Sequence, residues 1–229
     1  MSHALKKKIL AALESNDLDA VVSLSTGDRT VLSRLVRLAY DKETLVGWRA
    51  IKAVGLVARK LLKSDCEFLR DTCRKLLWSL SDESGGIGWS APEMLGEIVS
   101  AAPHRFADMI PLIVQAYDIE EDVFRPGVVY ALGCIAEADP EAAASFQKVI
   151  ISSLVDKEPL TCIYGLNLVE MLWRSGAAGR CWTQEYRDRV RSAVSRLKAD
   201  KAEAWVYRDT QFISVMTGEY ASALNNKLI

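Results

Sequence analysis

The stretch FRPGVVYALG, residues 124–133, decides the fold that this sequence predicts, because four other segments of the chain align with it. Each of the five segments begins at an acidic turn and runs into an apolar pattern of helical period. The patterns have reference positions at Gly55, Gly96, Gly133, Val169 and Phe212, so successive patterns are 41, 37, 36 and 43 residues apart. Self-similarity at a period of roughly 40 residues is typical of a repeat protein built from helix pairs.

A second helical pattern lies between the aligned segments, as in DCEFLRDTCRKLLWSL. Several helix-start signals agree with it. Ser64 and Glu67 have the spacing of a capping box, and Pro103 and Pro140 each stand at an expected first helical position, the latter after Asp139. No stretch is interpreted as having the alternation of apolar and polar residues that is typical of a β-strand. The pattern therefore predicts an all-α chain of antiparallel helix pairs.

FRPGVVYALG also resembles the second helix of the HEAT-repeat family, which reads approximately V-R-x-x-A-x-x-A-L-G after an Asp-rich turn. The resemblance covers approximately residues 28–216. It implies an α-α superhelix, a HEAT-like solenoid of about five antiparallel helix pairs with an N-terminal capping helix or helix pair. The expected single domain spans residues 1–229, with repeats at 28–62, 64–102, 103–138, 139–175 and 182–217 and an N-terminal cap at 2–24.

Charge and cysteine content limit the class of function. The 29 basic residues almost cancel the 30 acidic ones, whereas a strong nucleic-acid binder usually has a basic excess that replaces counterions around phosphates. Nucleic acid is therefore a less favoured partner than a protein or peptide. The five cysteines form no C-x-x-C pair and cannot all pair within one chain, so we expect a reducing, cytoplasmic setting. No apolar run reaches about 18 residues, so we expect no membrane span.

One face of the second helices carries large aromatic side chains, although the apolar stripe that predicts the core lies on the opposite face. In a solenoid this aromatic face usually lines the concave surface, where a contiguous apolar patch marks a binding site. Acidic residues outnumber basic ones on this face, which favours a cationic ligand held partly by cation-π attraction. The alternative is that the tryptophans pack against a neighbouring repeat. The predicted ligand-binding residues are Trp48, Trp89, Glu93, Tyr130, Glu137, Trp173, Trp205 and Asp209.

The glycine-rich stretch SGGIGWSAPEMLGE, residues 84–97, is interpreted as a turn before a helix that starts near Trp89. A glycine loop at a helix N-terminus can bind an anion, but this one lacks the lysine and hydroxyl of a nucleotide-binding loop. Trp89 and Glu93 lie one helical turn apart on the predicted wet face. Glu93 and Glu97 are like charges at i and i+4, which repel each other, so either a partner compensates them or water solvates them.

Catalytic and metal-binding residues form no assembled pattern in the sequence. The two histidines, His3 and His104, belong to no motif for metal ligation or a Ser-His-Asp relay, so we expect no metal and no cofactor. The basic run at residues 6–8 is interpreted as a solvated face. The basic helix that starts at Arg187 is either solvated or in contact with phosphates or an acidic partner.

These features predict an interaction or scaffold module that binds a protein segment or a cationic ligand. A second resemblance implies an enzymatic alternative, because the chain is similar in length and helix-pair architecture to the HEAT-like alkylpurine DNA glycosylases. That resemblance implies that Trp89, Glu93 and Trp173 contact an alkylated purine and that Glu93 is the catalytic carboxylate. The chain departs from that family because the family uses an aspartate at this point and has a basic groove.

Overall fold

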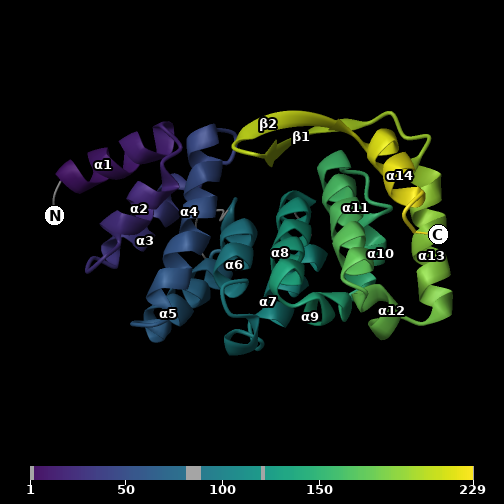
Figure 1. Cartoon of the computed structure of the whole chain (residues 1–229), viewed down its shortest axis with the longest axis horizontal. Helices are drawn as coiled ribbons and strands as arrows, with labels where there is room; N and C mark the ends of the chain where they lie inside the picture. The colour runs from purple at the N-terminus through teal and green to yellow at the C-terminus, as the bar shows by residue number, and fades with distance from the viewer. Residues whose placement is uncertain (1–2, 81–88, 120–121, 229) are drawn as a thin grey trace. The chain divides into compact units, whose positions relative to one another are not determined.

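The computed structural model describes residues 3–80, 89–119 and 122–228. Most of this part of the chain is helical, with one short two-stranded sheet, which confirms the predicted all-α class (Figure 1). The chain forms two compact units, one of residues 1–113 with 209–211 and the other of residues 114–208 with 212–229. Each unit contains packed helix pairs around its own apolar core. Residues 81–88, which include the start of the glycine-rich stretch interpreted as a turn, lie outside the described residues.

The first unit is a stack of helices in which α4 occupies a central place. α4 packs against α3, α5 and α6. α1 and α2 pack against each other and against α4, so the predicted N-terminal cap is a helix pair. The bounds are α1 (His3–Glu14), α2 (Leu18–Leu24), α3 (Thr30–Leu38), α4 (Leu45–Leu61), α5 (Cys66–Trp78), α6 (Ala91–Val99) and the 3-10 turn η2 (Pro103–Arg105).

The predicted apolar stripe of the second helices forms the core of this unit. Ala50, Val54 and Val57 of α4 and Met94 and Leu95 of α6 are fully buried. Burial of such side chains is the main favourable contribution to folding. The apolar stripe therefore correctly identified which face of each helix packs inward.

Local capping signals position the helix starts, with one change from the prediction. The carboxylate of Asp65 accepts a hydrogen bond from the Phe68 N–H at 3.2 Å and caps α5. The predicted capping box from Ser64 to Glu67 is therefore wrong by one residue, because the Ser64 hydroxyl instead donates to the Leu61 carbonyl. Pro103 opens only a 3-10 turn.

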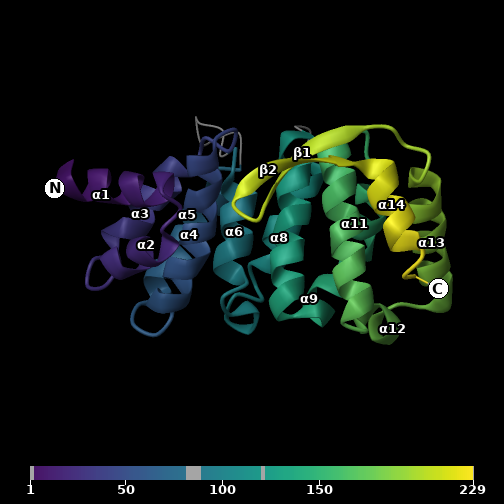
Figure 2. The same ribbon diagram turned by 45° about the horizontal axis from the view of Figure 1, so that its top comes forward.

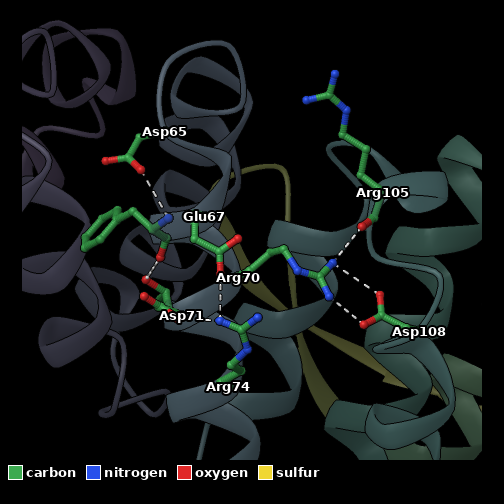
Figure 3. Close-up of polar contacts among 9 residues, drawn as sticks. Asp65, Glu67, Arg70, Asp71, Arg74, Arg105 and Asp108 are labelled. Carbon is green, nitrogen blue, oxygen red and sulfur yellow. Dashed lines mark hydrogen bonds and ion pairs between the residues drawn. The ribbon is translucent and has the colours of Figure 1, made fainter.

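An ion-pair network on α5 connects this helix to the segment that follows α6 (Figure 3). Arg70 donates to the Arg105 carbonyl at 2.8 Å and to both carboxylate oxygens of Asp108. Arg74 bonds Glu67 and Asp71 on the same helix at 2.8 and 2.5 Å. The Arg70 contacts therefore tie two successive helix pairs of the first unit together.

In the second unit, α11 lies beside α8, α14 and the strand β1 (Figure 2), and it also packs against α10. The unit boundary falls within α7 (Ile110–Gln115). Asp139 caps the helix that Pro140 begins, as predicted, by accepting from the Ala142 N–H at 3.0 Å. The remaining elements are η3 (Ala116–Asp118), η4 (Asp122–Phe124), α8 (Arg125–Ala138), α9 (Pro140–Ala144), α10 (Gln147–Ser153), α11 (Pro159–Arg174), α12 (Ala177–Cys181), α13 (Gln184–Leu197), β1 (Glu203–Arg208), β2 (Gln211–Met216) and α14 (Thr217–Asn225).

The second helix of the predicted fifth repeat is absent, and a β-hairpin stands in its place. β1 and β2 form a two-stranded sheet joined at Asp209 and Thr210. Both turn residues have positive φ, 49° and 72°, which is the backbone of a tight two-residue hairpin turn. The helical interpretation of residues 203–216 is therefore wrong.

None of the helices in the described parts of the chain is both long and apolar enough to cross a membrane.

Candidate functional site

The start of α6 is fixed to the end of α3 by a buried serine. The Ser90 hydroxyl donates to the Ala39 carbonyl at 2.5 Å, and Ser90 is fully buried. Tyr40 follows Ala39 in the chain and Trp89 precedes Ser90, and these two aromatic residues are 38 % and 44 % exposed. Of the predicted binding residues Trp48, Trp89 and Glu93, Trp89 is the one that reaches solvent.

The two carboxylates on α6 are buried between helices and paired with lysines. Glu93 and Glu97 are 2 % and 3 % exposed. Lys42 contacts Glu93 at 3.0 Å, and Lys52 contacts Glu97 at 2.5 Å. A buried charge is tolerated only when a partner replaces its hydration. The question of compensation or solvation that the sequence left open is thus answered by the two lysines.

The expectation that Trp48 and Glu93 face solvent is wrong. Trp48 is 4 % exposed and Glu93 is 2 % exposed. The reason is that α4 and α6, the second helices of successive pairs, pack directly against each other. Gly55 permits this approach, since a Cβ at that position would lie 2.4 Å from Glu97 Oε2. The face predicted to be wet is therefore largely an interface between helices.

One acceptor in this buried pair has no partner within the described residues. Glu93 Oε1 accepts from Lys42, whereas Glu93 Oε2 is buried without a hydrogen bond. An unsatisfied buried acceptor costs free energy, and Glu93 is only 2 % exposed, so its carboxylate offers almost no surface to a macromolecular ligand. We therefore assign Glu93 a packing and charge-pairing role in this structure.

In the second unit, the predicted aromatic residues of α8 and α11 are half-buried and already make ring contacts. Tyr130 packs edge-to-face on Tyr164, with ring centroids 5.5 Å apart. The Arg191 guanidinium stacks over the Trp173 ring at 5.0 Å, so an internal cation occupies the position that an external one was expected to take. Glu137 is exposed near the end of α8.

Trp205 and Asp209 lie on the hairpin rather than on a helix. Trp205 is 67 % exposed on β1, and Asp209 is at the turn. Alternation along the strands puts Trp205 on one face with Tyr207, Phe212 and Met216. Tyr207 and Phe212 are in edge-to-face contact at 6.0 Å. We call this surface, together with Glu203, the hairpin face.

The sequence contained a signal for the hairpin face that the repeat interpretation overrode. In EAWVYR and QFISVM, aromatic and β-branched residues are abundant, as is typical of strands. The turn signal is incomplete, because aspartate is common at the first position of such a turn but Thr210 stands where glycine is usual. Tyr207, Phe212 and Met216 were not among the predicted binding residues.

Two buried cysteines, Cys73 and Cys162, have thiols of low reactivity. Burial raises the pKa of the Cys73 thiol to about 12 and that of the Cys162 thiol to about 11, so both are protonated at neutral pH and are poor nucleophiles. No group of three or more His, Cys, Asp or Glu side chains in the described segments is arranged to hold a metal ion.

No protein-family model matches the chain. Among solved structures, the chain is similar to an archaeal HEAT-like repeats protein from Thermococcus onnurineus NA1, with 13 % sequence identity and a TM-score of 0.40. The similarity covers 97 % of this chain and 96 % of that one.

Proposed function

We propose that this chain is an interaction module and that the hairpin face binds an extended, basic segment of a partner protein. The observation that carries this proposal is Trp205, which is 67 % exposed at the centre of an otherwise half-buried aromatic face. Large exposed aromatic side chains that gather on one surface are the usual anchors of protein interfaces. Stacked helix pairs supply the rigid support on which such a surface is held.

The two faces of the hairpin have different environments. Val206 is 4 % exposed on the face that packs toward α11. Arg208 belongs to that same face by alternation, and its guanidinium lies 5.9 Å from the Tyr220 ring. The packed face is therefore occupied by the protein itself, and the opposite face with Trp205 is left for a ligand.

Charge on the hairpin face favours a basic ligand. Glu203 accepts a hydrogen bond from the Ser214 hydroxyl at 2.9 Å and forms no ion pair with any residue in the described ranges. The cation of β1, Arg208, is on the other face. A carboxylate beside an exposed indole suits a lysine or arginine side chain, which gains both Coulomb and cation-π attraction.

The strand edges favour an extended ligand. The sheet contains two strands, so each strand pairs with its partner along one edge only among the described residues. Unpaired strand edges present backbone N–H and C=O groups that can accept a third strand. In this mode the backbone supplies affinity and alternate side chains supply specificity.

The test uses the full chain and two fluorescently labelled peptides, one of alternating lysine and valine and one of alternating glutamate and valine. We expect the lysine peptide to give saturable fluorescence anisotropy and the glutamate peptide to give none at the same ionic strength. Trp205→Ala is expected to weaken binding of the lysine peptide by about tenfold or more, because central aromatic anchors carry most of the binding energy of an interface.

Trp78→Ala is the matched control, since Trp78 is also a well-exposed tryptophan, 58 %, but lies on α5. It should leave the affinity unchanged. Equal binding of both peptides, or equal loss in both variants, would contradict the proposed site.

The glycosylase resemblance is not the function that the geometry favours. It needs the Glu93 carboxylate beside a bound nucleoside, and that carboxylate is buried and bonded to Lys42. The cation-π face of Trp173 is taken by Arg191. A ligand on the hairpin face, by contrast, need not displace the Lys42 or Arg191 contacts.

A further inference from the structure

A cavity of about 190 Å³ lies between α1 and α3 in the first unit, far from the hairpin face in sequence. Its lining residues are Lys6, Ile9, Arg34, Arg37 and Leu38. Lys6 and Ile9 are three residues apart on α1, and Arg34 and Arg37 are three residues apart on α3, so each pair lies on one side of its helix. One ordered water needs only about 10–15 Å³ of such space, so the cavity has room for a group of several heavy atoms.

Three cations line this cavity and no carboxylate does. None of Lys6, Arg34 and Arg37 forms an ion pair or a side-chain hydrogen bond with another described residue. Arg34 Nε is buried and has no acceptor. The carboxylate of Asp28 feels the charge of Arg34, but it accepts its hydrogen bonds from the Thr30 N–H and hydroxyl. No described side chain therefore pairs directly with these cations, of which Lys6 and Arg37 are exposed and Arg34 is half-buried.

Another pair of like charges in the first unit, on α6, is neutralised by ion pairs. Glu93 and Glu97 on α6 repel each other, and Lys42 and Lys52 neutralise both. Two arginines at i and i+3 also repel, and Arg34, which is half-buried, and Arg37, which is exposed, have no acidic partner in the described part of the chain. A buried donor without an acceptor, with two further cations beside the same cavity, points to an external anion.

We propose that this cavity binds the phosphate group of a small phosphate monoester. A guanidinium matches the oxygens of a phosphate through two parallel N–H donors, and a lysine adds a point charge. The buried Arg34 Nε–H supplies a donor whose alternative is to remain unsatisfied. Ile9 and Leu38 provide an apolar wall for the carbon skeleton of the ester. Lys6 thus has a more specific role than the solvated face that the sequence predicts for residues 6–8.

The binding test uses isothermal titration of the full chain with inorganic phosphate and with glycerol 3-phosphate, each against sodium chloride of equal ionic strength. We expect saturable binding of both phosphates and none of chloride. Vesicles of phosphatidylcholine with and without phosphatidic acid distinguish a lipid headgroup from a soluble ester. Binding to the phosphatidic acid vesicles alone would overturn the proposal of a soluble ligand.

Two substitutions assign the binding to this cavity. Arg34→Gln and Arg37→Gln are each expected to weaken the binding of glycerol 3-phosphate about tenfold or more, because each removes a charge-assisted hydrogen bond. Arg34→Lys should retain part of the affinity. Lys75→Gln is the control, since Lys75 is exposed on α5 outside the cavity. Absence of phosphate binding to the unmodified chain would overturn the assignment. Equal affinity in Arg34→Gln, Arg37→Gln and the control Lys75→Gln, with unchanged circular dichroism, would also overturn it.

Discussion

Gly55 controls how closely α4 approaches α6. A Cβ at this position would lie 2.4 Å from Glu97 Oε2 and 3.1 Å from the Glu97 carbonyl oxygen. Contacts that short require either the carboxylate or the helix to move, and the carboxylate is held by Lys52. The packing of α4 against α6 therefore requires glycine at this position, although the backbone conformation there does not.

We expect Gly55→Ala to lower the free energy of unfolding by about 1–3 kcal/mol, the usual cost of an overpacked core. Urea unfolding followed by circular dichroism measures the change. Gly133→Ala is the control, because Gly133 is also a buried helical glycine and a Cβ there meets nothing within 4 Å. The control should be neutral or stabilising, since alanine favours a helix more than glycine does. Equal effects of the two substitutions would contradict the packing explanation.

Lys42 is the partner that allows Glu93 to be charged in the core. Its side chain is 18 % exposed and that of Glu93 is 2 % exposed. We expect Lys42→Met to destabilise the fold by about 3 kcal/mol, because it leaves a buried carboxylate unpaired. Adding Glu93→Gln should recover part of that loss. Chemical denaturation of the two variants and the unmodified chain measures this, and a double variant no more stable than Lys42→Met alone would contradict the pairing.

Residue-level patterns in the sequence correctly gave the apolar stripe but could not decide whether the opposite face is covered. Trp48 and Glu93 occupy helical positions that read as solvent-facing, and both are buried because α6 lies against α4. The angle of a side chain around its helix is a local property. Whether a neighbouring helix covers it depends on the spacing between helix pairs, which a single sequence does not specify.

At the scale of elements, the Arg70 network makes the stability of the first unit depend on pH. The hydrogen bond from Arg70 is the main cause that lowers the pKa of Asp108 below its ordinary value of 3.8. A carboxyl group whose pKa is lowered in the folded state adds stability above its ordinary pKa. That contribution is lost as the pH falls through the folded-state pKa.

Arg70→Gln should therefore reduce stability near about pH 6, and its effect should shrink as the pH falls below the ordinary Asp108 pKa of 3.8 and through the lowered pKa of the folded state. Thermal melts across this range measure the difference. The effect is modest, since Asp108 is 62 % exposed. Arg59→Gln, at an exposed position of α4, should show no such dependence. A pH-independent effect of Arg70→Gln would contradict the role of the ion pair.

The hairpin turn places a β-branched residue in an unfavourable backbone region. Thr210 has φ of 72°, which costs on the order of 1 kcal/mol for a residue with a Cβ. We expect Thr210→Gly to raise the free energy of unfolding by up to about 1 kcal/mol. Thr72→Gly within α5 should lower it, because glycine disfavours a helix. A loss of stability in Thr210→Gly would contradict the hairpin and restore the helical interpretation of this segment.

The helix elements were more predictable than the hairpin for a physical reason. Helical periodicity and caps such as Asp139 with Pro140 act within a few residues, so the sequence alone shows them. The strands carry aromatic and β-branched residues, but the turn sequence Asp209-Thr210 lacks the usual glycine or asparagine. A repeat period extended over residues 203–216 therefore gave a helix where the chain forms a sheet.

At the scale of the whole molecule, aromatic residues that look alike in the sequence divide into two roles. Trp48 is inside the first unit, and Trp173 is covered by Arg191 in the second. Trp205 stands on the exposed hairpin face. The helix pairs form the support, and the departure from helical structure near the end of the chain forms the proposed binding surface.

The most direct test of this division compares Trp48→Ala and Trp205→Ala in the full chain, with stability from urea unfolding and affinity from the alternating lysine-valine peptide. We predict that Trp48→Ala loses about 3 kcal/mol of stability, as buried aromatic truncations do, and keeps its peptide affinity under conditions where it remains folded. Trp205→Ala should keep its stability and lose binding by about tenfold or more. Loss of binding in Trp48→Ala with undiminished binding in Trp205→Ala would contradict the account.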